Sequence, residues 1–172
     1  MINFSSGLKW LWLTVLVVCL DLWTKNLASH YLQMHEPVAV IPGFNLTLMH
    51  NYGAAFSFLG DAGGWQRWFF ICLTLAVSTF IVIWLYGLKA SQRWIPCALA
   101  MILGGAAGNL WDRVTLGYVI DFIDISLVFL PWRLFNPWPA FNVADSAITI
   151  GAVMLIIDAI WLNGAQKNDV SD

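Results

Sequence analysis

Four long apolar stretches, separated by shorter polar segments, dominate the pattern of this chain. They cover about residues 8–28, 68–88, 94–114 and 141–162. The clearest stretch, Trp68 to Leu88, contains no charged residue and lies between Arg67 and Lys89. A helix needs about 20 mostly apolar residues to cross a bilayer. Each stretch therefore predicts one membrane-spanning helix.

The composition agrees with a protein that is surrounded by lipid. Apolar residues make up 60% of the chain, charged residues only 10%, and the mean hydropathy is +0.73. Soluble domains carry roughly 25% charged residues, so the composition excludes a soluble domain. The eight Lys and Arg are scattered and the net charge is −2. This excludes the basic patch that a nucleic-acid-binding protein needs.

The positive charges predict the orientation of the four spans. The side that carries both termini holds four of the eight, namely Lys9, Lys89, Arg93 and Lys167, whereas the outer connections carry mainly Arg67 and Arg133. Cytoplasmic segments of membrane proteins carry the excess of Lys and Arg, so we expect both termini in the cytoplasm. The two longer connections, about residues 29–66 and 115–140, then face outward.

Both outer connections contain sequence that does not predict a helix. In Val38–His50, a Pro42-Gly43 turn precedes an approximate alternation of apolar and polar residues, which predicts short strands. Pro131–Pro139 holds three prolines and predicts an irregular interfacial loop. The expected fold is an all-α membrane protein of four transmembrane helices with a small extracytoplasmic β-element and a second outer loop. Residues 1–172 form a single integral membrane domain in this interpretation.

Charged residues inside the predicted spans indicate where function lies, because each costs roughly 2.5 to 3.5 kcal/mol at the bilayer centre. Asp21 and Lys25 are four residues apart in the first span, and an ion pair between them is the simplest interpretation. Near the outer end of the third span, Asn109, Asp112 and Arg113 follow one another at helical spacing. We expect Asp112 and Arg113 to neutralise each other partly, and Asn109 and Arg113 to share a face that can hold a substrate.

The small residues before this cluster, Gly104 to Gly108, allow close approach of two helix backbones.

Three further aspartates, Asp121, Asp124 and Asp145, lie at the predicted outer boundary. Two carboxyl groups held close together share a proton, and the ionised one can then deprotonate water, as aspartic peptidases require. The alternative is structural: Asn142 caps the fourth helix with Asp145 at its third position, while the other two aspartates are solvated loop residues. Spacing alone favours this capping interpretation slightly.

Asp158 cannot join such a site. It follows Asp145 by thirteen residues, or about 20 Å along a helix.

Neither the histidines nor the cysteines predict a metal centre. His30, His35 and His50 lack the close pairing of zinc ligands. The three cysteines lie far apart inside apolar stretches and are typical of small core residues. We therefore expect no metal and no cofactor.

Five motifs carry a resemblance that spans nearly the whole chain. They are Asp21–Lys25, Asn51–Ser57, Gly104–Arg113, Val119–Phe122 and Phe141–Ser146. In these residues and in their order, the chain resembles the signal peptidase II family of aspartic peptidases of the bacterial cytoplasmic (inner) membrane. The resemblance implies that Asp121 and Asp145 are the catalytic pair, which reverses the preference for capping.

The resemblance also implies which residues surround that pair. Substrate-binding residues would be Asn51, Gly53, Asn109, Arg113 and Asn142, with support from Asp21, Lys25 and Asp112. The implied substrate is a prolipoprotein, cleaved just before a cysteine that carries a diacylglyceryl group, on the extracytoplasmic side and beside membrane lipid. No span shows an unexplained polar face that demands a partner, so a monomer is expected. Asp124 lies outside the shared pattern.

A small transporter is the main competing class. It would place its buried carboxylates near the middle of the bilayer, whereas these aspartates gather at one predicted edge.

Overall fold

The computed structural model describes residues 7–53, 63–126 and 138–162. Four helices in this part of the chain are long and apolar enough to cross a membrane. They are α1 (Leu11–Tyr31), which the short helix η1 (Gly7–Trp10) precedes, α2 (Trp65–Gly87), α3 (Trp94–Thr115) and α4 (Val143–Ile157), which η4 (Asp158–Leu162) extends. The predicted four-helix membrane fold is confirmed, with helix ends close to those expected.

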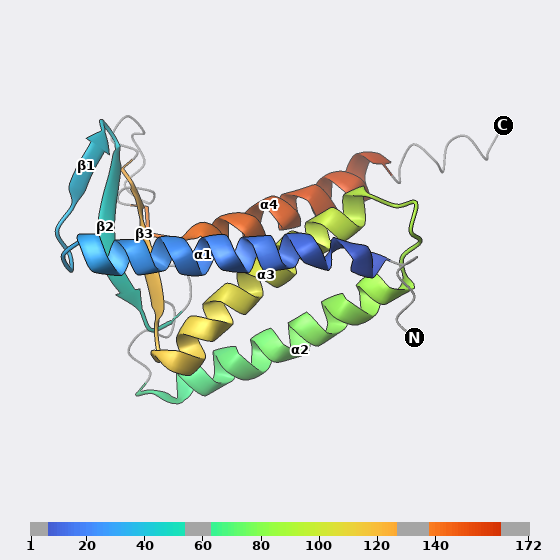
Figure 1. The fold of residues 1–172 in the computed structure, drawn as a ribbon, viewed down its shortest axis with the longest axis horizontal. Coiled ribbons are helices and arrows are strands. Elements are labelled where there is room, and N and C mark those ends of the chain that lie inside the picture. The colour runs from blue at the N-terminus through green and yellow to red at the C-terminus, as the bar shows by residue number, and fades with distance from the viewer. Residues whose placement is uncertain (1–6, 54–62, 127–137, 163–172) are drawn as a thin grey trace.

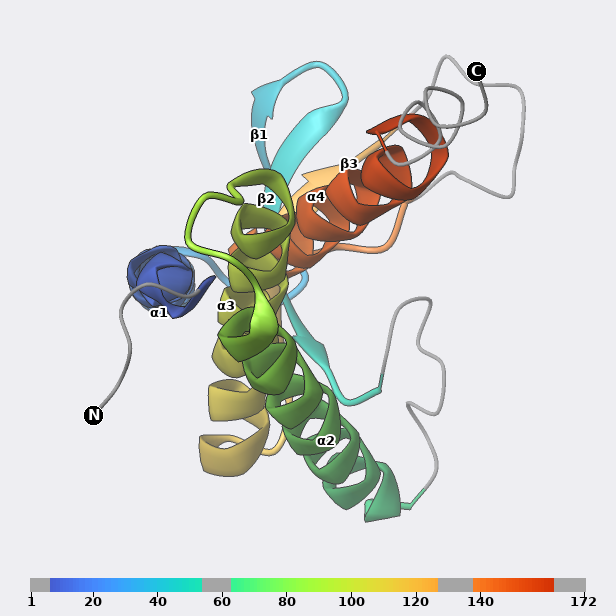
Figure 2. The same ribbon diagram turned by 90° about the vertical axis from the view of Figure 1, so that its right-hand side faces the viewer.

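The helices form a bundle with a small sheet at one end (Figure 1). The start of η1 and the end of η4 both lie at the opposite end of the bundle (Figure 1). Figure 2 shows α3 at the centre, with α1, α2 and α4 around it. The central helix α3 carries Asn109, Asp112 and Arg113, so this arrangement surrounds the polar residues with the other helices.

Glycines make the close packing around α3 possible. A Cβ atom on Gly105 would lie 2.2 Å from the backbone oxygen of Ala144 in α4. A Cβ atom on Gly108 would lie 2.4 Å from a carboxylate oxygen of Asp21 in α1. The small-residue stretch therefore brings α1 and α4 against α3, as its pattern predicts.

The sheet consists of β1 (Val38–Ile41), β2 (Phe44–Asn51) and β3 (Val119–Ile125), in the order β1-β2-β3 with antiparallel neighbours. The predicted small β-element is confirmed, and β1 and β2 form a hairpin within it. Gly43 adopts a positive φ of 84° in its turn, which glycine accepts without a Cβ clash.

The third strand is a feature that the sequence interpretation missed. Asp121 and Asp124 were expected in an outer connection, as solvated loop residues in one of the two alternatives. Instead, β3 pairs with β2, with Met49 opposite Asp121 and Asn51 opposite Val119. Ile120 and Phe122 pack in a core cluster with Ala28 at the end of α1, so the strand is buried and fixed to the bundle.

Parts of three sequence predictions lie outside the described residues. They are the end of the Asn51–Ser57 motif, most of Pro131–Pro139, and Lys167 among the charges used for orientation.

Candidate active site

Asp121 and Asp145 reach one region from two different elements. Asp121 lies on β3, and Asp145 lies in the first turn of α4. The backbone of Phe141 exchanges hydrogen bonds with that of Ile123 on β3, which brings the start of α4 beside the strand. Two aspartates that are far apart in the sequence thereby come to lie on neighbouring segments.

Asn142 connects the two carboxyl groups. Its Nδ2 donates a hydrogen bond to Asp121 Oδ1 at 2.8 Å, and its Oδ1 accepts one from the backbone N–H of Asp145 at 2.9 Å. Asp145 Oδ2 in turn accepts a hydrogen bond from the backbone N–H of Asn142 at 3.2 Å. This reciprocal exchange is the capping box that the spacing favoured. The capping motif and the carboxyl pair are therefore compatible, and one set of contacts builds both.

Asn109 links Asp145 to the buried charges of the bundle. Its Nδ2 donates to Asp145 Oδ1 at 2.8 Å. Its Oδ1 accepts hydrogen bonds from Lys25 Nζ at 2.9 Å and from Asn142 Nδ2 at 3.1 Å. Because both ends of the amide have partners, the orientation of Asn109 is fixed by the network.

Lys25 is the buried centre of this network. Its ammonium lies 2.7 Å from Asp21 Oδ2 and 2.9 Å from Asp112 Oδ2. The expected Asp21–Lys25 ion pair is present. Among the described residues no ion pair joins Asp112 to Arg113, because consecutive side chains of a helix point in different directions. The expected partial neutralisation is limited to the charge of Asp112 acting on Arg113 without direct contact. Asp112 turns instead toward Lys25.

The two Lys25 partners also fix backbone segments of the site. Asp21 Oδ1 accepts a hydrogen bond from the backbone N–H of Ala144 at 2.9 Å. Asp112 Oδ2 accepts one from the backbone N–H of Ile120 at 3.1 Å. Ala144 precedes Asp145 and Ile120 precedes Asp121 in the chain. The ion-pair network therefore fixes the backbone next to both catalytic candidates.

Asn51 and Arg113 occupy the other side of Asp121. Asn51 Nδ2 donates to Asp121 Oδ2 at 3.0 Å, and Asn51 Oδ1 accepts from the backbone N–H of Gly53 at 3.0 Å. Arg113 Nη2 donates to the backbone oxygen of Gly53 at 2.8 Å. The structure thus brings together all ten residues that the resemblance named for the site.

The environment of Asp121 raises its pKa to about 7. The main cause is burial, which disfavours the charged form, and the second is the negative charge of nearby Asp145. The Asn51 and Asn142 hydrogen bonds and the charge of Lys25 act in the opposite direction. Asp121 therefore holds its proton up to near neutral pH, as one member of a carboxyl pair must.

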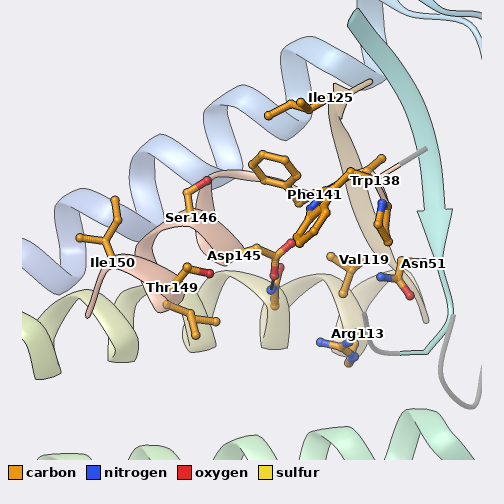
Figure 3. Close-up of a pocket in the computed structure, with 14 residues that line it drawn as sticks. Asn51, Arg113, Val119, Ile125, Trp138, Phe141, Asp145, Ser146, Thr149 and Ile150 are labelled. Carbon is orange, nitrogen blue, oxygen red and sulfur yellow. Dashed lines mark hydrogen bonds between the residues drawn. The ribbon is translucent and has the colours of Figure 1, made fainter. Parts of the chain in front are cut away.

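A cavity of about 680 Å³ opens beside these residues. Figure 3 shows Asp145 pointing into it, with Asn51 and Arg113 at one end. Asp121 lies behind this lining and is only 3% exposed. The rest of the wall is mainly apolar, and includes Val119, Ile125, Trp138, Phe141, Ile148 and Ile150. A ligand with both a polar and an apolar part fits these surroundings.

The sequence interpretation gave no role to this apolar wall. One signal was available on α4, where Ile148 and Thr149 follow Asp145 at the i+3 and i+4 positions of one helix face. Trp138 and Phe141 precede the helix and carry no comparable pattern.

Asp124 does not join the pair. It accepts a hydrogen bond from Thr47 Oγ1 at 2.8 Å. Because side chains alternate along a strand, residues 121 and 124 point to opposite faces of β3. Asp158 lies at the far end of α4, where η4 begins. Among the described residues, no group of three or more His, Cys, Asp or Glu side chains could hold a metal ion.

Comparisons with known proteins agree with this architecture. The family model described as signal peptidase (SPase) II matches residues 13–161. A lipoprotein signal peptidase of Acinetobacter baumannii is 52% identical over 159 residues, covering 92% of this chain and 87% of the relative. One of Yersinia pseudotuberculosis is 47% identical over 169 residues, covering 97% and 95%. A solved structure described as a bacterial membrane enzyme has a TM-score of 0.75 and 30% identity, covering 95% of this chain and 90% of that one.

In this multi-pass membrane bundle Asp145 lines a cavity and Asp121 lies behind it, and Asn142 contacts both residues. Two neighbouring carboxyl groups are what a membrane aspartic peptidase requires. The family model and the relatives identify one family within this class. The chain belongs to the signal peptidase II family.

Proposed function

We propose that Asp121 and Asp145 are the catalytic residues with which this chain performs the reaction of its family. A signal peptidase II is an aspartic peptidase, and this chain removes signal peptides from prolipoproteins. The observation that carries the assignment is the position of Asn142, whose side chain donates to Asp121 and accepts from the backbone N–H of Asp145, the residue that lines the cavity. The raised pKa of Asp121, due partly to Asp145, supports it.

In the proposed mechanism, a water molecule lies between the two carboxyl groups. The ionised carboxylate of Asp145 takes a proton from this water, and the resulting hydroxide attacks the scissile carbonyl carbon. Protonated Asp121 donates its proton to the carbonyl oxygen. The tetrahedral intermediate then collapses, the C–N bond breaks, and the leaving amine receives a proton from the pair.

The surrounding residues receive two kinds of role. Asn51, Gly53, Asn109, Arg113 and Asn142 bind the substrate backbone or orient the carboxyl pair. Their amide and guanidinium donors suit an extended peptide, whose carbonyl groups are free to accept hydrogen bonds. Asp21, Lys25 and Asp112 hold the backbone on which the pair is mounted.

The proposed substrate is a prolipoprotein whose cysteine already carries a diacylglyceryl group. The apolar wall of the cavity supports this, because it offers a surface for a lipid beside the polar site. Cleavage occurs just before the cysteine while the lipid stays in the membrane. We further propose that the chain acts as a single integral membrane domain and as a monomer.

The proposed orientation puts both termini in the cytoplasm and the site on the extracytoplasmic side of the bacterial inner membrane. Lys9, Lys89 and Arg93 lie at the end of the bundle that is away from the sheet. Their positive charges support a cytoplasmic position for that end.

The test compares three Asp→Asn variants, purified in detergent, on a diacylated prolipoprotein. Asp121→Asn and Asp145→Asn should lose activity by at least about a thousandfold, within the range for loss of an acid or base. Asp124→Asn, the matched control, should retain it. Full processing by either of the first two variants would overturn the assignment. Equal cleavage of the diacylated substrate and its unlipidated twin would overturn the lipid part alone.

A further inference from the structure

The first turns of α2 contact Arg113 at two places. The guanidinium of Arg67 donates from Nε to the backbone oxygen of Arg113 and from Nη2 to that of Val114, both at 2.8 Å. The guanidinium of Arg113 lies over the ring of Phe70, with Cζ 5.0 Å from the ring centroid. Arg67 and Phe70 are three residues apart and therefore share one face of α2.

The Arg67 contact completes the end of α3. The last carbonyl groups of a helix lack partners within the helix, and Arg67 provides donors for two of them. Its positive charge also suits the negative end of the helix dipole. The chain turns sharply after this point, because Gly117 adopts a φ of 90°. A Cβ atom on Gly117 would lie 3.4 Å from Arg67 Nη1, so the guanidinium packs directly against the turn.

Three contacts therefore fix the position of Arg113. Arg67 donates to its backbone oxygen, its guanidinium lies over the ring of Phe70, and its Nη2 donates to the Gly53 carbonyl at 2.8 Å. A free arginine side chain loses substantial rotamer entropy when it binds a ligand. An arginine that is already oriented loses less, and Arg113 lines the cavity.

We propose that Arg67 and Phe70 are positioning residues that direct the Arg113 guanidinium toward the substrate backbone. This inference rests on the substrate-binding role of Arg113 in the proposed function. It assigns a catalytic consequence to the start of α2, where the sequence indicated only Arg67 as a charge at the end of a span.

The test measures kcat and KM separately on a diacylated prolipoprotein. Arg67→Gln should raise KM by about tenfold, the effect of misaligning one charge-assisted hydrogen bond, and should change kcat much less. Arg67→Lys keeps a cation near the carbonyl groups, so its KM should lie between that of the parent protein and that of Arg67→Gln. Phe70→Leu should also raise KM. Phe69→Leu, at the neighbouring exposed position on α2, is the matched control and should not.

A double-mutant cycle separates positioning from general stability. If Arg67 acts through Arg113, then Arg67→Gln should add little to KM in an Arg113→Gln background. Full additivity of the two changes, or an unchanged KM in Arg67→Gln, would overturn the inference. Either result leaves the catalytic assignment intact as long as Asp121→Asn and Asp145→Asn are inactive. Activity in those two variants would instead remove the proposed function.

Discussion

Asn142 and Asp145 cap each other at the start of α4, and this exchange determines where the Asn142 amide group points. Its Oδ1 is occupied by the backbone N–H of Asp145. Its Nδ2 is therefore directed to the opposite side, where it donates to Asp121. A local motif of helix initiation thus orients a donor in the candidate active site.

The variant Asn142→Ser should separate these two roles. Serine is a good N-cap, so α4 should still begin at the same residue. A serine hydroxyl cannot reproduce the amide contacts to Asp121 and Asn109, and activity should fall by about a hundredfold, as for a lost preorganised donor. Thermal unfolding in detergent and steady-state kinetics measure the two effects. Asn142→Ala should be less stable than Asn142→Ser by about 1 kcal/mol. Full activity in the serine variant would contradict the dual role.

The pH dependence of kcat/KM should report the proton on Asp121. In the proposed mechanism Asp121 must be protonated, and its pKa is raised to about 7. Activity should therefore fall as the pH rises through about 7. Asn51→Ala removes a hydrogen bond that favours the charged form. The pKa of Asp121 should then rise further, and the alkaline limb should move to higher pH. A shift of this limb to lower pH would contradict the assignment of the proton.

Removal of the buried ammonium should be strongly destabilising. Lys25→Met leaves the carboxylates of Asp21 and Asp112 without their cation, and breaking a buried ion pair in this way costs about 3 to 5 kcal/mol. Activity should fall in parallel because Asn109 loses a donor. Lys89→Met, at an exposed position, is the control and should unfold like the parent protein. An unchanged unfolding temperature for Lys25→Met would show that the network contributes no stability.

Gly108 should tolerate no larger side chain. An alanine Cβ would lie 2.4 Å from Asp21 Oδ2, so α1 and α3 must separate or Asp21 must move. Both changes disturb the backbone beside Asp145, and Gly108→Ala should lose stability and most of its activity. Gly87→Ala, where a Cβ meets nothing within 4 Å, is the matched control and should leave both intact. Normal activity in Gly108→Ala would mean that the helices can relax without moving the site.

Hydropathy was sufficient to predict the helices, because a bilayer requires long apolar segments whatever their neighbours are. The short strands of the β-element followed from a Pro-Gly turn and an alternating pattern. The strand β3 was missed for a physical reason. Its buried residues, Val119 to Phe122, do not alternate in exposure, so the usual signal of a half-buried strand is absent.

The partners of the polar residues could be predicted only where they are local. The Asp21–Lys25 pair lies on one helix face and was found from its spacing. The contacts of Asp112 with Lys25 and of Asn142 with Asp121 depend on how separate elements pack. Without the family resemblance, spacing favoured capping over catalysis for Asp145. It could not reveal that one geometry permits both.

The separation of Lys25 from its α3 partners along the chain has a consequence for biogenesis. Lys25 and Asn109 are 84 residues apart, so α1 is synthesised well before α3 exists to receive it. During that interval Asp21 is the cation's partner on its own helix, and their pairing lowers the cost of placing both charges in lipid. The same ion pair that later supports the site thus also lowers the free-energy cost of inserting its own helix into the membrane.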